Sequence, residues 1–407
     1  MGMPHPMMMP TGIQQGHCMA QTQAEKEAQA VQTYVAMFAP DRIDENFRTM
    51  AQTYASITLP RSGPVAPLPE KPCASVFPET YAYEGAQHSL ADLLNAQHWT
   101  GLAIAQGGAL VFEDYARGNT AVSRPVLMSV SKSVLSILFG IAHAEGDIPD
   151  LNALVTDYVP ELSGTGYDNV TLQQVLDMTS GIRFTEDYED LNSDIVRSVV
   201  AFLIGSQDEF CKTLINEKPP GSFFQYASVE THVLGWVLRR ATGRSFADYF
   251  TEKLWSQIGA ESDADMLTDQ AGQPLVYGGL HLCLRDLMRI GLMLAHGGKT
   301  ADGMQIVPAG WITQSTTPDT PQSRPGARMP YSEDLFGYKN QWWLPVTPDH
   351  GDFSAIGIYG QFLYVNPHRD VVIAMNSAYR DYNDTGEEME MQMLCAFQAI
   401  ARYLTPD

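Results

Sequence analysis

The chain has 407 residues, of which 44% are hydrophobic and 18% are charged, and its formal net charge is -22. So much apolar material excludes a disordered chain and indicates one large folded domain or two smaller ones. The acidic balance argues against a nucleic-acid partner, because phosphate binding requires clustered Lys and Arg.

The N-terminal residues and the cysteines indicate where the protein resides. Residues 1–10 are rich in Met and Pro but lack the basic and apolar stretches of a signal peptide. No window approaches the roughly 18 apolar residues of a membrane helix. The cysteines, among them Cys18, Cys73 and Cys211, are far apart and form no CxxC pair, which disfavours disulfides and zinc. We therefore expect a cytoplasmic protein without a membrane partner.

Residues 1–80 are interpreted as an N-terminal extension. The Ala- and Glu-rich residues 20–38 favour a helix, and the prolines of residues 57–72 are typical of an extended linker. Folded structure is expected to begin near Tyr81. The extension has two open roles, which are to cover the active site or to mediate contacts in a homodimer.

Residues 81–128 read as the first part of a sheet domain. Residues 90–97 favour a helix, and residues 101–106 and 109–115 favour two strands. A Gly-Gly pair separates these strands, and such pairs are typical of hairpin turns.

Residues 129–270 are mostly helical by pattern, because the apolar residues recur at helical spacing. Strand and helix patterns then return near the C-terminus, at residues 359–367, 370–377 and 387–403. The predicted fold is an α/β domain of residues 81–128 and 271–407, with an antiparallel sheet flanked by helices, and an inserted, mostly helical domain of residues 129–270.

Ser129 and Lys132 stand at the head of the most apolar helical stretch. A spacing of three places both side chains on one helix face, about 5–6 Å apart at Cβ. Burial lowers the pKa of a lysine, and a neutral amine within reach can take the serine proton during attack on a carbonyl. A solvated lysine is the alternative. However, the stretch SVLSILFGIA after Lys132 is almost wholly apolar, so a lysine at its head has little structural reason to be there.

A second element is Tyr226-Ala227-Ser228, which lies between a turn-forming stretch and a predicted helix. A phenol at such a junction can reach a neighbouring group, and beside a protonated lysine its pKa falls from about 10. Tyr226 is therefore a candidate general acid for the leaving group. Ser228 has the equally open role of helix N-cap.

The third element is the stretch SAIGIYGQ at residues 354–361, which leads into a strand. Glycines at a strand edge allow another group to approach the backbone closely. A backbone N–H here, paired with that of Ser129, would form an oxyanion hole. A plain strand start with a bulge is the alternative.

The three elements together resemble the serine β-lactamase and penicillin-binding-protein superfamily, and within it the class C-like esterases and the 6-aminohexanoate-oligomer (nylon oligomer) hydrolases. The resemblance spans residues 101–403 and includes the stretches LDMTSGI (176–182), YASVETHVLGWVLRRATG (226–243) and GGLHLCLRDLMRIG (278–291). It implies a β-lactamase-like fold with the site in the cleft between the two domains.

The resemblance also implies the roles of the catalytic groups. Ser129 would be the nucleophile, Lys132 its base and Tyr226 the proton-relay partner of that base. The backbone N–H groups of Ser129 and Ile358 would form the oxyanion hole.

A substrate-binding surface follows from the same resemblance, made of Tyr188, Ser228, His281 and Tyr359. In the nylon-oligomer branch a tyrosine of the helical domain hydrogen-bonds the substrate amide, and Tyr188 is similar to it in position. A packed surface tyrosine and a helix-start histidine are the alternatives for Tyr188 and His281.

Two motifs depart from the β-lactamase pattern. β-Lactamases usually have Tyr-x-Asn where this chain has Tyr226-Ala227-Ser228, and Lys-Thr-Gly where it has Ala355-Ile356-Gly357. The lost lysine would bind the carboxylate of the antibiotic, so we expect little β-lactam turnover.

We therefore expect a serine hydrolase that forms an acyl-enzyme on Ser129 and acts on small esters as a carboxylesterase. A 6-aminohexanoate-oligomer-type amidase is the alternative, and its substrate would likewise be a small molecule. A non-catalytic scaffold of the same fold is a further alternative, against which the intact Ser129, Lys132 and Tyr226 argue. The scattered histidines and the lack of an HExxH motif predict no metal and no cofactor.

Overall fold

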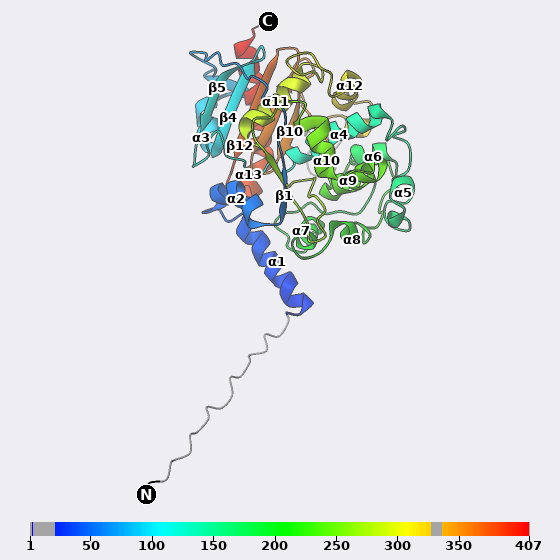
Figure 1. The fold of residues 1–407 in the computed structure, drawn as a ribbon. Coiled ribbons are helices and arrows are strands. Elements are labelled where there is room, and N and C mark those ends of the chain that lie inside the picture. The colour runs from blue at the N-terminus through cyan, green and yellow to red at the C-terminus, as the bar shows by residue number, and fades with distance from the viewer. Residues whose placement is uncertain (1, 3–20, 327–335, 407) are drawn as a thin grey trace.

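The computed structural model describes residues 2, 21–326 and 336–406 of the chain, which are arranged as Figure 1 shows. Apart from Gly2, the predictions for the N-terminal Met- and Pro-rich stretch fall outside the described residues, as does Cys18.

The main sheet, within the described residues, has seven antiparallel strands in the order β5-β4-β12-β11-β10-β9-β8. Two segments far apart in the sequence supply the strands, which are β4 (Trp99–Gln106), β5 (Ala109–Tyr115), β8 (Gly337–Lys339), β9 (Trp342–Leu344), β10 (Phe353–Gly357), β11 (Gln361–Asn366) and β12 (Val371–Ser377). β12 pairs with β4 from Val371↔Gln106 to Ser377↔Trp99, which joins the C-terminal part of the chain to the predicted hairpin.

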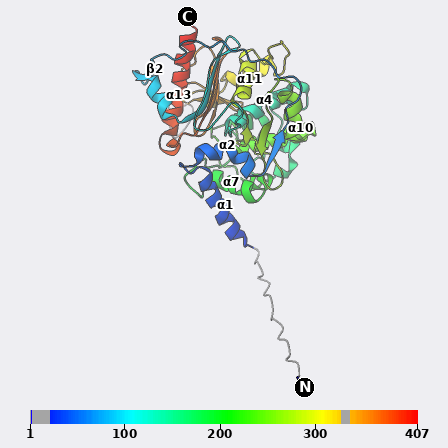
Figure 2. The same ribbon diagram turned by 60° about the vertical axis from the view of Figure 1, so that its left-hand side comes forward.

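The sheet is covered on both faces, because its apolar side chains alternate between two sides. Leu102 and Ile104 of β4 belong to the core under α13 (Tyr382–Leu404), whereas Ala103 and Ala105 belong to the core that includes α11 (Leu284–Ala295). Figure 2 shows the sheet between these two helices. α11 packs closely because a Cβ at Gly291 would lie only 2.4 Å from the side chain of Val372.

The helices on the right of Figure 1 lie between β5 and β8 in the sequence. They include α4 (Val130–Glu145), α5 (Val155–Tyr158), α6 (Leu172–Leu176), α7 (Asp194–Ile204), α8 (Gln207–Cys211), α9 (Ser228–Thr242), α10 (Phe246–Phe250) and α12 (Ala309–Thr316). The short helix α3 (Leu90–Ala96) precedes β4 in the sequence and lies on the left of Figure 1. α4 is buried from Val130 to Ala142, since its sequence is apolar on all sides after Lys132. It ends at Gly146, which adopts the left-handed conformation (φ 89°) that favours glycine.

The segment before residue 81 differs from its predicted form. The helix predicted over residues 20–38 is confirmed by α1 (Gln23–Met37). The segment also forms α2 (Ile43–Thr53) and β1 (Ser56–Leu59), so the prediction that folded structure begins near Tyr81 is wrong. β1 pairs with β6 (Ala264–Leu267), which in turn pairs with β7 (Leu280–His281). A local reading of the prolines could not reveal this pairing, because the partner strand lies about 200 residues further on.

The division into a sheet domain and a helical domain stays a prediction. One apolar core contains side chains of the main sheet, such as Leu363 and Val372, together with side chains of α4 and α9, such as Leu138 and Val233. In the described part of the chain, no helix has both the length and the apolar character needed to cross a membrane. The cysteines Cys73, Cys211, Cys283 and Cys395 are free thiols.

Candidate active site

Ser129 lies at the N-terminal end of α4, directly after a strained turn. Met128 has a φ of 47°, a left-handed conformation that is costly for a side chain of this size. Ser129 takes the N-cap position, but its side chain makes no capping hydrogen bond. The Oγ atom is therefore available to another partner.

That partner is Lys132. Its Nζ atom donates a hydrogen bond to Ser129 Oγ across 2.7 Å and a second one to the backbone oxygen of Tyr277 across 2.8 Å. Lys132 is only 1% exposed. Burial lowers the pKa of its amine to about 7, and the nearby Glu186 carboxylate partly opposes this shift. A substantial fraction of the amine is thus neutral at physiological pH.

Tyr226 lies over the same amine. It precedes α9 by two residues, and its ring centroid is 5.0 Å from Lys132 Nζ. The ring stacks on Trp343 at 5.3 Å and meets the edge of Tyr338 at 5.8 Å. These contacts fix the phenol plane, since a stacked aromatic ring has few alternative rotamers. The structure thus brings Ser129, Lys132 and Tyr226 together.

Ser228 and Tyr188 meet at a carboxylate that had no predicted role. Glu186 accepts hydrogen bonds from the backbone N–H of Ser228 at 2.9 Å and from the hydroxyl of Tyr188 at 2.7 Å, and the Ser228 hydroxyl also donates to it. Ser228 is the first residue of α9 and Ala227 its N-cap, so the N-cap alternative for Ser228 is wrong. Because Glu186 sits at a helix N-terminus, the helix dipole stabilises its charge.

The end of β10 lies against the start of α4. A Cβ added at Gly357 would be 2.6 Å from the carbonyl oxygen of Leu127 and 3.0 Å from the nitrogen of Ser129. Only a glycine permits this approach, and Ile358 follows it directly in the chain. Among the described residues, neither the N–H of Ser129 nor that of Ile358 donates a hydrogen bond outside the regular helices and strands.

Tyr359 and His281 take positions that differ from the predicted substrate surface. Tyr359 is 6% exposed and is packed among aromatic rings, so little of it can contact a ligand directly. His281 lies in strand β7 and not at a helix start, and it is fully buried with Nδ1 against the carbonyl oxygen of Gly279 at 2.9 Å. Burial lowers its pKa to about 4. The expectation that His281 lines the cleft is wrong, because it has no exposed surface.

Sequence reasoning missed two contributors to this site. The carbonyl of Tyr277 holds the lysine, and a backbone group carries no sequence signal. Glu186 belongs to the Glu-Asp-Tyr stretch around Tyr188, and its three hydrogen bonds from Tyr188 and Ser228 become apparent only once the loop and α9 are placed together.

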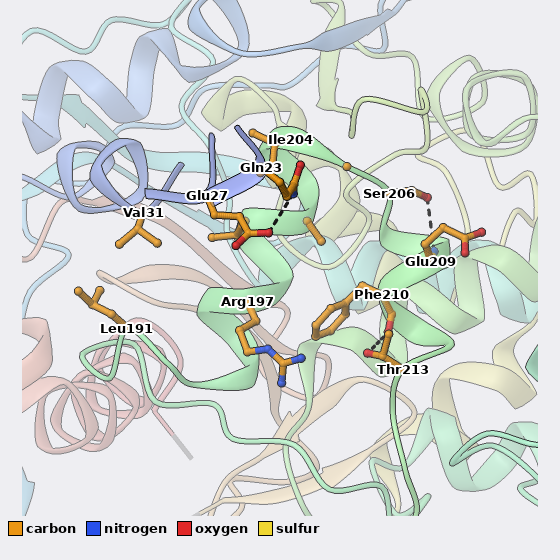
Figure 3. A pocket seen from close by; sticks show the side chains of 13 residues that line it. Gln23, Glu27, Val31, Leu191, Arg197, Ile204, Ser206, Glu209, Phe210 and Thr213 are labelled. Carbon is orange, nitrogen blue, oxygen red and sulfur yellow. Dashed lines mark hydrogen bonds between the residues drawn. The ribbon is translucent and has the colours of Figure 1, made fainter. Parts of the chain in front are cut away.

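A pocket of 490 Å³ opens elsewhere, between α1 and α7. Figure 3 shows Glu27 and Val31 of α1 on one side and Arg197 and Phe210 on the other. Neither Ser129 nor Lys132 lines it, so this pocket is separate from the Ser-Lys pair. No group of His, Cys, Asp and Glu in the described residues has the arrangement of a metal site.

Comparison with known proteins shows the family to which the chain belongs. A sequence model of the Beta-lactamase family matches residues 90–397. The 6-aminohexanoate-dimer hydrolase of Paenarthrobacter ureafaciens is 34% identical over 286 residues, which cover 68% of this chain and 72% of that protein.

Two solved structures share the fold. One, provisionally described as a 6-aminohexanoate-dimer hydrolase from Bacillus anthracis, has a TM-score of 0.77 at 23% identity and covers 90% of this chain and 95% of its own. A family VIII carboxylesterase has a TM-score of 0.57 at 18% identity, with 82% of this chain and 99% of its own covered.

An antiparallel sheet between helices, with a buried Ser-Lys pair beneath a tyrosine, defines the class of β-lactamase-like and penicillin-binding-protein-like serine hydrolases. The members of this class work through an acyl-enzyme on serine. The chain belongs to the Beta-lactamase family and is a homologue of 6-aminohexanoate-dimer hydrolase. The predicted family resemblance and the predicted β-lactamase-like fold are thereby confirmed.

Proposed function

We propose that this protein hydrolyses small carboxylic esters through an acyl-enzyme on Ser129. The observation that carries the proposal is the 2.7 Å contact between Lys132 Nζ and Ser129 Oγ at a site where Lys132 is 1% exposed. A neutral amine in this position can accept the serine proton, which turns the hydroxyl into a nucleophile.

The first half of the reaction forms the acyl-enzyme. Ser129 Oγ attacks the ester carbonyl while its proton passes to Lys132, directly or through Tyr226. The negative charge on the carbonyl oxygen would be held by the N–H groups of Ser129 and Ile358, and the contact of Gly357 with the Ser129 backbone supports this pairing. Collapse of the intermediate breaks the bond to the leaving alcohol, which takes the proton back from the Lys132–Tyr226 pair.

The second half of the reaction hydrolyses the acyl-enzyme and uses the same catalytic groups. Water attacks the acyl carbonyl, the Lys132–Tyr226 pair takes the water proton, and the carboxylic acid leaves as the proton returns to Ser129. At the end of a full cycle, each group of the site has returned to its starting protonation state.

Linear amides are a second candidate substrate class, favoured by the orientation of Tyr188. Its hydroxyl donates a hydrogen bond to Glu186 across 2.7 Å, so the lone pairs of the phenol oxygen remain free to accept one. The N–H of an amide can donate to such an oxygen, whereas an ester oxygen cannot. Homology to 6-aminohexanoate-dimer hydrolase also supports linear amides as substrates.

Active-site labelling tests the proposal. The wild-type protein and the Ser129→Ala variant would be treated with a fluorophosphonate probe, digested and mapped, and p-nitrophenyl butyrate turnover would be measured in parallel. We expect a label on the peptide containing Ser129 and a loss of turnover by several orders of magnitude in the variant.

Other outcomes would contradict the proposal. A label on another serine, or turnover that survives in Ser129→Ala, would overturn the assignment of the nucleophile. Neither label nor turnover in the wild type would favour the non-catalytic scaffold. Hydrolysis of nitrocefin as fast as of simple esters would show that the loss of the lysine at Ala355 does not exclude β-lactams.

A further inference from the structure

The N-terminal helices contribute a group of aromatic side chains that lies against the candidate active site. Tyr34 and Phe38 come from α1 and its C-cap, and Phe47 comes from α2. Tyr34 meets the edge of Phe38 at 5.3 Å, and Phe38 meets the edge of Phe47 at 6.2 Å. In Figures 1 and 2, both helices lie at the same side of the molecule as α7. We call these three residues the aromatic clamp.

The clamp holds Tyr359 directly after the proposed oxyanion residue Ile358. Phe38 stacks on the Tyr359 ring with centroids 5.1 Å apart and planes 11° apart, and Phe47 meets its edge at 5.6 Å. Tyr382 covers it from the C-terminal helix at 5.0 Å. Rings from the two N-terminal helices and from the C-terminal helix, which are far apart in the sequence, thus enclose one side chain.

Tyr359 needs such support, because its backbone is strained. Its φ of 63° lies in the left-handed region, which a tyrosine rarely adopts unless the surroundings impose it. Without the enclosing rings, Tyr359 would relax toward an extended backbone and pull on Ile358. The N–H of Ile358 would then lose its direction toward the carbonyl oxygen of a bound ester.

The aromatic clamp also contacts the segment that carries Tyr188. The hydroxyl of Tyr34, a residue that is 5% exposed, donates a hydrogen bond to the backbone oxygen of Tyr188 across 2.9 Å. Tyr188 in turn donates its own hydroxyl to Glu186. The extension therefore fixes the position of the segment that presents the Tyr188 phenol.

We propose that the aromatic clamp Tyr34, Phe38 and Phe47 is a set of positioning residues for the oxyanion hole and for Tyr188, so that the N-terminal helices are a working part of the active site. The clamp residues touch no reacting atom. This inference rests on the proposed function, because it assigns a purpose to Ile358 that only acyl transfer requires.

The test compares full-length variants at Phe38 on p-nitrophenyl butyrate. Phe38→Ala removes the stacked ring, Phe38→Tyr keeps it, and Val35→Ala changes an exposed side chain on the same helix (53% exposed) as the matched control. We expect Phe38→Ala to lower kcat by about 10- to 100-fold, part of the loss seen when an oxyanion donor is removed, while KM changes little. Phe38→Tyr and Val35→Ala should keep kcat within about twofold of the wild type.

The rate of fluorophosphonate labelling at Ser129 gives an independent readout, since the phosphonyl oxygen uses the same hole. It should fall in parallel with kcat in Phe38→Ala. If Phe38→Ala does not fold, Phe38→Leu, which keeps the apolar volume but not the flat ring, gives the same comparison.

The outcomes separate the two proposals. An unlabelled and inactive wild type would overturn the proposed function itself. The wild type could instead be labelled and active while Phe38→Ala has a lower melting temperature but an unchanged kcat. That outcome would overturn only the proposed role of the aromatic clamp, and it would mean that the N-terminal helices contribute to stability alone. A rise in KM without a fall in kcat would likewise contradict the clamp.

Discussion

Lys132 donates a hydrogen bond from Nζ to the backbone oxygen of Tyr277 across 2.8 Å, and the same Nζ lies 2.7 Å from Ser129 Oγ. A neutral amine has two protons and one lone pair. With one proton committed to this carbonyl, the lone pair can face the Ser129 hydroxyl. The carbonyl of Tyr277 would thus orient the proposed base without contributing a side chain.

The buried amine should make stability depend on pH. The pKa of Lys132 is about 7 in the folded protein and near 10.5 when unfolded, so between these values the unfolded chain binds more protons. Stability therefore rises with pH from about 7 to 10.5, at up to about 1.4 kcal/mol per pH unit. In Lys132→Met we expect this contribution to be absent and turnover to be lost.

Urea unfolding of both proteins across this pH range checks the prediction. The difference between wild type and Lys132→Met should grow with pH in favour of the wild type. A difference that is flat with pH would mean that the amine is charged in the folded protein.

The rate of ester hydrolysis should increase as pH rises through about 7, because only the neutral amine accepts the serine proton. The Glu186 carboxylate raises the pKa of Lys132, so Glu186→Gln should lower that pKa and move the acid limb of the kcat/KM profile to lower pH. Glu189→Gln, an exposed carboxylate in the same loop, is the control and should leave the limb in place. A shift to higher pH in Glu186→Gln would contradict this assignment.

Gly357→Ala should impair the oxyanion hole. The new methyl group would lie 2.6 Å from the Leu127 oxygen and 3.0 Å from the Ser129 nitrogen. Both are backbone atoms, which cannot move aside as the end of a flexible side chain can. We expect kcat to fall by about 10²- to 10³-fold and stability by about 1–3 kcal/mol. Gly310→Ala is the matched control, because its Cβ meets nothing within 4 Å and glycine in a helix is unfavourable. Equal activity of both variants would argue against an oxyanion hole at this position.

Tyr188→Phe should separate the two candidate substrate classes. Loss of an acceptor for the substrate N–H should slow the hydrolysis of a linear amide about 3- to 10-fold, the effect of one neutral hydrogen bond. Ester hydrolysis lacks that contact and should change less. The ratio of kcat/KM for matched p-nitroanilide and p-nitrophenyl substrates measures the effect, and an unchanged ratio would remove Tyr188 from amide recognition.

Local sequence spacing predicted the parts of the site that lie on one element. Ser129 and Lys132 are three residues apart on a helix, so their contact follows from helix geometry alone. The strands around the Gly-Gly turn and the helix after Tyr226 were likewise expected from residue patterns.

Features that depend on distant segments could not be predicted in this way. His281 precedes an apolar helical pattern, yet pairing with Asp265 places it in a strand that is buried on both sides. Similarly, nothing in the sequence around Phe38 indicates a stack on Tyr359, which lies more than 300 residues away. Such contacts are decided by how the elements pack, and not by local propensity.

The pairing of β1 with β6, and of Phe38 with Tyr359, also bears on how the protein is made. During synthesis the first helices leave the ribosome long before their partners, by a delay on the order of tens of seconds at typical translation rates. In that interval their apolar faces are unprotected. The helix α4, which carries Ser129, can form early, but the proposed oxyanion hole is completed only when the last fifth of the chain has been made. We therefore expect a truncated product to be partly folded and inactive.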